Sequence, residues 1–209
     1  MLALAPHPDD ETLGCGGLLA LASADGAPTR VAYLTDGEGS HPASLAWPPA
    51  RLGARRRQEA RRACHVLGVT RTPVFLGLPD AGTPGADLAA AAARLRAVIL
   101  RERPGLVVTT WAGEPHCDHQ AAWRVARAAT AGTPARRLAF TVWAGRLSDE
   151  RPSGAPLTLA LVPARAAKRR ALAAHRSQLG QVVRDDPGGF VLSARDREAM
   201  LGPAERYWA

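Results

Sequence analysis

Short apolar segments alternate with longer helical segments from the first residue to about residue 143, and this alternation constrains the fold most. The strand-like segments are residues 1–5, 30–35, 73–76, 106–110 and 138–143. The helix-like segments between them are residues 13–24, 51–67, 87–103 and 120–131. Such regular alternation predicts an α/β fold, in which a mostly parallel sheet is flanked by helices on both faces.

The remaining residues predict a small C-terminal extension rather than a second domain. Residues 145–156 are rich in Ser, Gly, Pro and charged residues, which is typical of a loop. After this loop we expect a strand at 157–162 and a basic helix at 164–179. Because 209 residues fit one domain, we expect a single domain over 1–209, with a core of about 1–143 and an extension of about 157–209.

The basic charge of the chain is a weak guide to its partners. The formal net charge is +8, from 27 Lys and Arg against 19 Asp and Glu. Only one of the cationic residues is a lysine, Lys168, and alanine is abundant. This bias fits a GC-rich bacterial genome, so the high charge is not evidence for a nucleic-acid partner, and we expect none.

The cellular compartment can be predicted from three absences in the sequence. No run of about 18 apolar residues is present, so we expect no membrane span. The first six residues carry no basic residue and lead directly into a polar segment, so we expect no signal peptide. The three cysteines (Cys15, Cys64 and Cys117) are widely spaced and suggest no disulfide framework, which fits a reducing cytoplasm.

Polar residues follow the predicted strands, where parallel sheets bind their ligands. The first such segment is His7-Pro8-Asp9-Asp10-Glu11. Clustered carboxylates repel one another unless a cation lies among them, and imidazole and carboxylate are ligands that Zn²⁺ accepts. Adjacent side chains point apart, so one of Asp9 and Asp10 can bind metal while the other faces the reacting water. The alternative is an acidic helix N-terminus with no metal.

The second segment, His116-Cys117-Asp118-His119, follows the fourth predicted strand. A catalytic zinc site has three protein ligands and one open position. His7, Asp10 and one of the two histidines form such a set, and the other histidine is then free to act as an acid or an electrostatic stabiliser. We expect Asp118 to orient a histidine from behind, and Cys117 to point away. The alternative is a helix N-terminus with surface histidines.

These motifs resemble the signature of the PIG-L, or LmbE-like, family of zinc-dependent N-deacetylases. The resemblance rests on the segments 5–17, 35–38, 76–80 and 116–119, the pair Arg56 and Glu59, and the C-terminal Lys168, His175, Ser177 and Gln178. It implies a Rossmann-like fold and an enzyme that hydrolyses an acetamide, often on an N-acetylglucosamine unit, with Zn²⁺ as cofactor and another divalent ion such as Fe²⁺ as an alternative.

The resemblance also implies a role for each site residue. His7, Asp10 and His119 resemble the metal ligands, and Asp9 resembles the general base. His116 resembles the group that stabilises the oxyanion or protonates the leaving amine, and Asp118 resembles its tuning partner. Arg56, Asp80 and Glu38 resemble substrate-binding residues.

Two aromatic side chains and several alternatives remain open at this stage. Trp47 and Trp111 are candidates for stacking on a sugar ring. An amidase of thiol–sugar conjugates would use the same chemistry. A nucleotide- or nucleic-acid-binding domain and an inactive zinc-binding scaffold are alternatives of other classes. The substrate and the oligomeric state cannot be read from the residues.

Overall fold

The structure, a computed structural model, describes all 209 residues and contains a parallel sheet of five strands. The strand order is β3-β2-β1-β4-β5. The strands are β1 (Leu2–Ala5), β2 (Arg30–Thr35), β3 (Val74–Leu78), β4 (Leu106–Thr110) and β5 (Arg136–Phe140). The chain adds β2 and β3 on one side of β1 and then β4 and β5 on the other side, so the strand order reverses between β1 and β4. Open α/β sheets form their ligand crevices at such a point.

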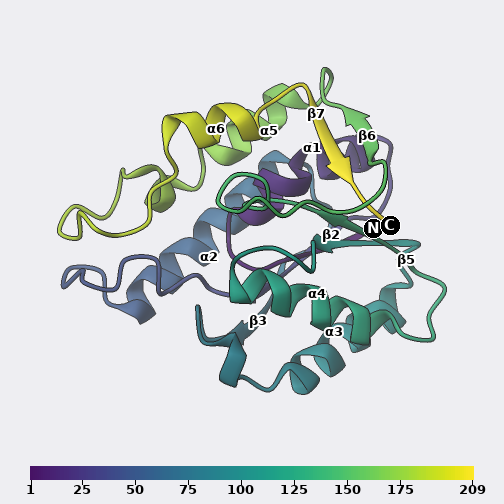
Figure 1. Ribbon diagram of the computed structural model, residues 1–209, viewed down its shortest axis with the longest axis horizontal. Coiled ribbons are helices and arrows are strands. Elements are labelled where there is room, and N and C mark those ends of the chain that lie inside the picture. The colour runs from purple at the N-terminus through teal and green to yellow at the C-terminus, as the bar shows by residue number, and fades with distance from the viewer.

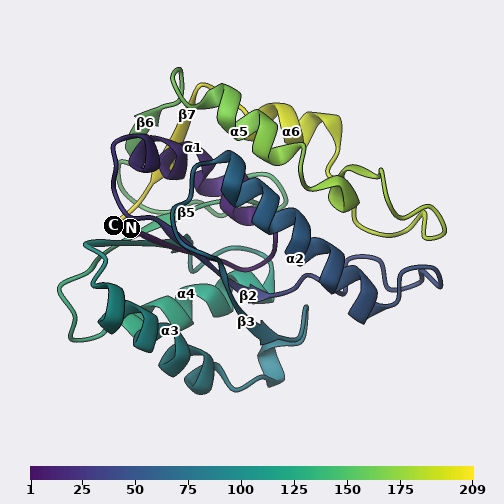
Figure 2. The same cartoon turned by 180° about the vertical axis from the view of Figure 1, so that it is seen from behind.

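Helices cover both faces of this sheet, as the alternation predicts (Figures 1 and 2). Helices α1 (Asp10–Ala24) and α2 (Pro49–Val66) cover one face, and α3 (Leu88–Glu102) and α4 (Cys117–Thr130) cover the other. Alternate residues of β1 enter the two cores: Ala3 and Ala5 pack towards α1 and α2, whereas Leu2 and Leu4 pack towards α3 and α4. This two-sided burial explains why the strand reads as a continuous apolar run.

Helix α1 lies unusually close to its neighbours because glycines face them. A Cβ atom on Gly14 would lie 2.0 Å from Cδ2 of Phe140, and one on Gly17 would lie 2.1 Å from Cδ2 of Leu161. A side chain at either position would therefore prevent this close packing. The backbone of Cys15 is not helical, with φ −140° and ψ 20°, so α1 is kinked at this residue.

The C-terminal extension packs on the α1 and α2 side of the molecule (Figure 1). It contains a two-stranded antiparallel sheet of β6 (Leu157–Ala160) and β7 (Ala204–Tyr207), and helices α5 (Arg165–Leu172) and α6 (Ala194–Met200). Beyond β7, the backbone of Trp208 exchanges two hydrogen bonds with Ala139 of β5. The extension is therefore joined to the edge of the main sheet.

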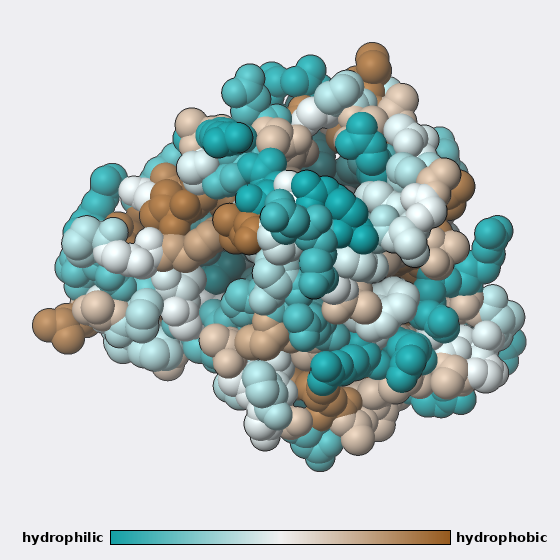
Figure 3. Space-filling view, in the orientation of Figure 1, coloured by the Kyte–Doolittle hydropathy of each residue, from teal (hydrophilic) through white to brown (hydrophobic).

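The face of the molecule seen in Figure 3 is mixed in character. Hydrophilic residues cover most of it, and the apolar residues, drawn in brown, lie in separate small groups. The most exposed large apolar side chains of the protein, Leu45 and Val162, come from two different segments of the chain. Single apolar residues of this kind are normal on protein surfaces.

The structure corrects several boundaries expected from the sequence. The basic helix is not continuous over 164–179: α5 ends at Leu172, and a separate 3-10 helix, η2, spans Arg176–Leu179. The intervening turn brings His175 into the interior, where it is 1% exposed. Helix α1 begins at Asp10 rather than residue 13, and β7 and α6 were not expected. No helix combines the length and the apolar character that crossing a membrane requires.

Candidate metal and catalytic centre

The residues of the two polar segments predicted to carry out the chemistry lie at the carboxyl ends of β1 and β4, where the strand order reverses. A cavity of about 380 Å³ opens there. Its lining includes His7, Asp9 and Asp10 from the β1–α1 turn, and His116 from the turn before α4. The two polar segments, more than 100 residues apart in sequence, therefore form one site.

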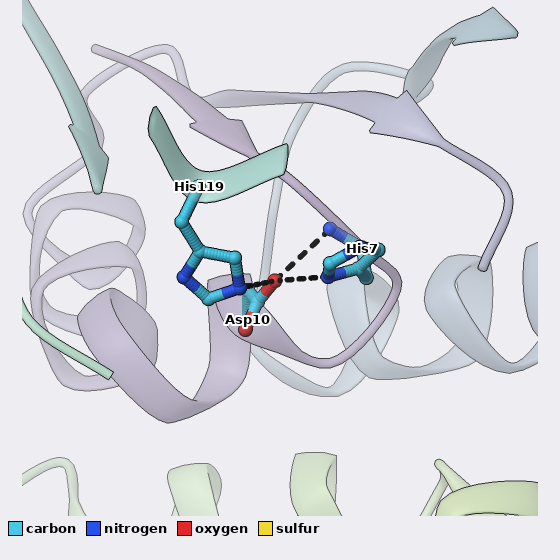
Figure 4. Close-up of side chains that lie close together, drawn as sticks. All are labelled: His7, Asp10 and His119. Atoms are coloured by element: carbon cyan, nitrogen blue, oxygen red, sulfur yellow. Dashed lines mark hydrogen bonds and ion pairs between the residues drawn. The ribbon is translucent and has the colours of Figure 1, made fainter. Parts of the chain in front are cut away.

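His7, Asp10 and His119 form a compact cluster (Figure 4). Oδ2 of Asp10 lies 3.1 Å from Nδ1 of His7 and 3.3 Å from Nε2 of His119. One ligand atom from each residue lies within 4.8 Å of the other two, and all three are buried or nearly so. The cluster has the donor types and spacing to hold one divalent metal ion.

The hydrogen bonding of His119 supports this interpretation. Its Nε2 is buried and has no hydrogen-bond partner, whereas its Nδ1 lies 3.0 Å from Oε2 of Glu114. A carboxylate behind the ring fixes the tautomer and directs the other nitrogen forward, as at metal-bound histidines. A bound ion would satisfy the unpartnered nitrogen, so the residues fit a metal.

Electrostatics in the cluster also favour a cation. Although burial raises the pKa of Asp10, His119 and His7 hold it well below its usual range. Burial lowers the pKa of His119, but Asp10 and Glu114 raise it to about 9. The pKa of His7 is likewise raised by Asp10 and Asp118, so both rings favour a positive charge beside this carboxylate. A divalent ion would take the place of the protons on these rings, because metal binding and protonation compete for the same nitrogens.

Glu114 is a buried supporting residue that the sequence analysis missed. Besides its contact with His119, it accepts hydrogen bonds from the backbone N–H groups of residues 142, 143 and 144 at 2.9 to 3.0 Å. It is fully buried. Its position in a polar loop directly after a strand, two residues before His116, was the available signal. Through these bonds the end of β5 fixes the orientation of His119.

Asp118 orients a histidine, but not the one that the family resemblance implied. Its Oδ2 lies 2.9 Å from Nε2 of His7 and accepts a hydrogen bond from the N–H of Ala81, and its Oδ1 accepts one from Thr83. Its only contact with His116 is a backbone N–H that donates to Nδ1 of that ring at 3.2 Å. The Asp118 carboxylate therefore acts on His116 through its charge, which raises the pKa of that ring against the larger lowering effect of burial, while its direct contact is with His7.

His7, His116 and Asp118 form a second group with metal-ligand spacing. Oxygens of Asp118 already accept two protein hydrogen bonds, and His116 is only partly buried. In the group with His119, Asp10 and His119 are buried, His7 is nearly so, and one ring nitrogen is unpartnered. The structure therefore favours His7, Asp10 and His119 as the candidate metal ligands.

Asp9 lies next to this cluster in a strained conformation. Its φ is 129° and its ψ is −32°, a region that residues with a side chain rarely adopt. The side chain lines the cavity, and Oδ2 lies 3.3 Å from the guanidinium of Arg56. Burial raises the pKa of Asp9 to about 7, against the opposing effect of Arg56. A carboxylate with a pKa near neutrality is well suited to accept a proton.

His116 lies at the start of α4 with its ring towards the cavity. The ring centroid lies 5.0 Å from that of His7 in an edge-to-face arrangement. Because Nδ1 accepts the Asp118 N–H, the proton of the neutral ring is on Nε2. Burial, together with His7 and His119, lowers the pKa of His116. The neutral ring can therefore donate a hydrogen bond from Nε2.

The Cys117 thiol is directed towards Asp118 and Ala81 and does not line the cavity.

The structure divides the three residues expected to bind substrate. Arg56 and Asp80 line the cavity, whereas Glu38 does not and instead accepts a hydrogen bond from the Asp80 N–H at 2.9 Å. Trp47 and Trp111 are also absent from the lining, and Trp47 stacks on Arg51. The aromatic wall consists of Trp143 and Phe190, whose rings pack edge to face at 5.8 Å.

Comparison with known proteins identifies the family. The chain is 34% identical to 1D-myo-inositol 2-acetamido-2-deoxy-alpha-D-glucopyranoside deacetylase of Mycobacteroides abscessus, over 92% of this chain and 85% of that protein. The conserved protein TT1542 of Thermus thermophilus is 29% identical, with a TM-score of 0.72 over 100% of this chain and 93% of the other.

A deacetylase triple mutant from the teicoplanin biosynthetic pathway has the same fold. Its TM-score is 0.78 at 23% identity, and the match covers 99% of this chain and 95% of the other. Residues 2–130 match the family described as PIG-L, GlcNAc-PI de-N-acetylase. Since this match spans more than half of the chain, the protein belongs to the PIG-L family of de-N-acetylases.

Proposed function

We propose that this enzyme hydrolyses the acetamide of an N-acetylglucosamine-type sugar or sugar conjugate, and that a divalent ion, Zn²⁺ in the first instance, is held by His7, Asp10 and His119. The observation that supports this most is the buried, unpartnered Nε2 of His119 beside the carboxylate of Asp10, a residue that lines the same cavity as Asp9 and His116. When bound, the ion supplies Lewis-acid chemistry that activates water and polarises a carbonyl.

The protein's own groups account for the proton transfers. Asp9 accepts a proton from the attacking water, whose oxygen forms a bond to the acetamide carbon. His116 donates a hydrogen bond from Nε2 to the former carbonyl oxygen as it gains negative charge. Asp9 then delivers its proton to the nitrogen, the C–N bond breaks, and acetate and the amine leave. Arg56 holds the Asp9 carboxylate during these steps.

The rest of the cavity suits a sugar. Arg56 and Asp80 provide charged groups at the reacting end, and Trp143 and Phe190 provide an apolar surface on which a sugar ring can pack. The volume of about 380 Å³ lies within the range of small-molecule sites, roughly 300–1,000 Å³. The three free cysteines fit a cytoplasmic location, and nothing in the cavity resembles a phosphate-binding loop, so we propose no nucleic-acid partner.

A screen of acetate release tests this function. The zinc-loaded protein would be incubated with N-acetylglucosamine, its inositol and oligosaccharide conjugates, and a thiol–sugar conjugate, with Asp9→Asn as the inactive control. We expect acetate and an equal amount of free amine from at least one N-acetylated sugar. Turnover of the thiol–sugar amide alone, or no turnover of any acetamide, would contradict the proposal.

A further inference from the structure

Glu11 is a fully buried carboxylate that the proposed mechanism does not use. It follows the candidate ligand Asp10 directly but does not line the cavity. Its Oε2 accepts a hydrogen bond from the backbone N–H of Asp9 at 2.9 Å, and its Oε1 accepts one from Thr12 at 2.6 Å. The carboxylate therefore bridges the turn that carries the general base.

His175 completes this arrangement from the distant end of the sequence. Its Nε2 lies 2.9 Å from Oε1 of Glu11, and the imidazole is 1% exposed. The turn between α5 and η2, which interrupts the helix expected over 164–179, places His175 there. Without this partner, Glu11 would be a buried carboxylate beside Asp9 and Asp10, and such charges are costly unless they are paired.

The backbone of Asp9 explains why such support is needed. A residue held in a sparsely populated φ, ψ region costs about 1–3 kcal/mol and persists only where its surroundings fix it. Besides the helical hydrogen bonds to its carbonyl, two side chains hold Asp9, whose φ is 129°. Arg56 donates to the carbonyl of Pro8 at 2.7 Å and contacts the Asp9 carboxylate, whereas Glu11 holds the Asp9 N–H.

We propose that Glu11 and His175 form a positioning pair, which holds the Asp9 backbone in its strained conformation and so aims the Asp9 carboxylate at the reacting water. The inference rests on the proposed function, because it assumes that Asp9 is the base. A purely structural role is the competing explanation: the pair would then stabilise α1 without affecting the chemistry.

Replacement of His175 by alanine, followed by addition of free imidazole, separates these explanations. The variant removes the ring and leaves space for imidazole to bind beside Glu11. We expect kcat to fall by about 10²-fold, the cost of roughly 1 Å of misplacement at a reacting group, with KM and metal content unchanged. Imidazole should restore kcat with saturation. His65→Ala, which replaces an exposed histidine of α2, should leave kcat unchanged with or without imidazole.

Two results would overturn the proposal. One is His175→Ala with the kcat of the wild type. The other is imidazole that restores the melting temperature but not kcat. If His175→Ala does not fold, Glu11→Gln provides the same kcat and KM comparison. A crystal structure of the variant gives a readout independent of activity: φ of Asp9 should relax to a negative value. A wild type that deacetylates no sugar would contradict the proposed function, whereas an unchanged φ would contradict the positioning role.

Discussion

Asp9 and Asp10 are neighbours with the same side chain and opposite acid–base properties. Asp10 faces two histidines, which hold its pKa far below the usual range. Asp9 is buried beside a single guanidinium, and burial raises its pKa to about 7. The sequence indicates that the two carboxylates point in different directions. The residues alone do not say which one faces the histidines, because that depends on α4 approaching from more than 100 residues away; the family resemblance assigns this place to Asp10, and the geometry agrees.

The rate should therefore depend on pH through Asp9. A base must be ionised, so kcat/KM should fall as the pH drops through the pKa of Asp9, at or below about 7 because a bound cation also favours the carboxylate. His116 has a lowered pKa and acts as a neutral donor, so it should contribute no alkaline limb near pH 7 to 8. This differs from the bell-shaped profile that a protonated His116 would give.

His116→Ala tests the same account. The variant should keep the metal and the acid limb while kcat falls by about 10²–10³-fold, the cost of one oxyanion donor. Steady-state kinetics between pH 5 and 9, with metal analysis of the same samples, would decide. An alkaline limb that disappears in His116→Ala would show that the ring acts in its protonated form.

Asp9 should also make the metal-free protein less stable at higher pH. Because its pKa is raised in the folded state, the stability it contributes is complete below its ordinary pKa of 3.8 and is lost as the pH rises through about 7. Asp9→Asn removes this dependence. The melting temperature of metal-free Asp9→Asn minus that of the metal-free wild type should be larger at pH 8 than at pH 5. An equal difference at both pH values would show that Asp9 titrates normally.

At the scale of single elements, helix α1 determines the position of the site. Its first turn provides Asp10 and Glu11, and its glycines let it lie directly on Phe140 and Leu161. Next to the kink at Cys15, the carbonyl of Leu13 accepts a hydrogen bond from Nζ of Lys168. The helix therefore depends on contacts from β5 and from the C-terminal extension.

Gly14→Ala should destabilise the protein more than a comparable change elsewhere. The new methyl group would overlap the ring of Phe140, which is 1% exposed and cannot easily move. Overpacking of this kind costs typically about 1–3 kcal/mol of unfolding free energy. Gly105→Ala is the matched control, because a Cβ atom there meets no other atom within 4 Å. Urea unfolding would check this, and equal stabilities of the two variants would contradict the packing argument.

The sequence predicts the elements of the sheet well because each strand is buried on both faces and bounded by polar turns. The site residues could be predicted for the related reason that parallel strands end at the same edge. The break at His175 could not, because the residues that hold it there are distant in sequence: His175 contacts Glu11, and Ser177 donates hydrogen bonds to Glu59. The strand β7 was missed because its four residues, Ala-Glu-Arg-Tyr, carry no apolar run.

At the scale of the whole molecule, the extension is connected to the core by a buried ion pair. Lys168 of α5 donates to Oε1 of Glu205 in β7 at 2.7 Å. Glu205 also accepts the N–H groups of Gly17 and Leu18, next to the kink of α1. One carboxylate thus joins β7, α5 and the helix that carries Asp10. We propose on this basis that residues 1–209 fold as a single cooperative domain.

Glu205→Gln should therefore destabilise the whole molecule and not only the extension. Breaking one side of a buried ion pair costs about 3–5 kcal/mol, and Glu198→Gln, on the exposed face of α6, should cost little. Thermal unfolding monitored by circular dichroism should show one transition at a lower temperature. Two separate transitions in the wild type or the variant would show that the extension unfolds independently.

The most direct test of the account measures turnover and bound metal together in Asp9→Asn. The variant retains the three candidate ligands and removes only the base, so we expect it to bind one divalent ion per chain, the same amount that we expect for the wild type. Its release of acetate from an N-acetylated sugar should be slower by about 10²–10⁴-fold. Loss of the metal from Asp9→Asn would contradict the assignment of the two aspartates, and turnover equal to that of the wild type would contradict the mechanism.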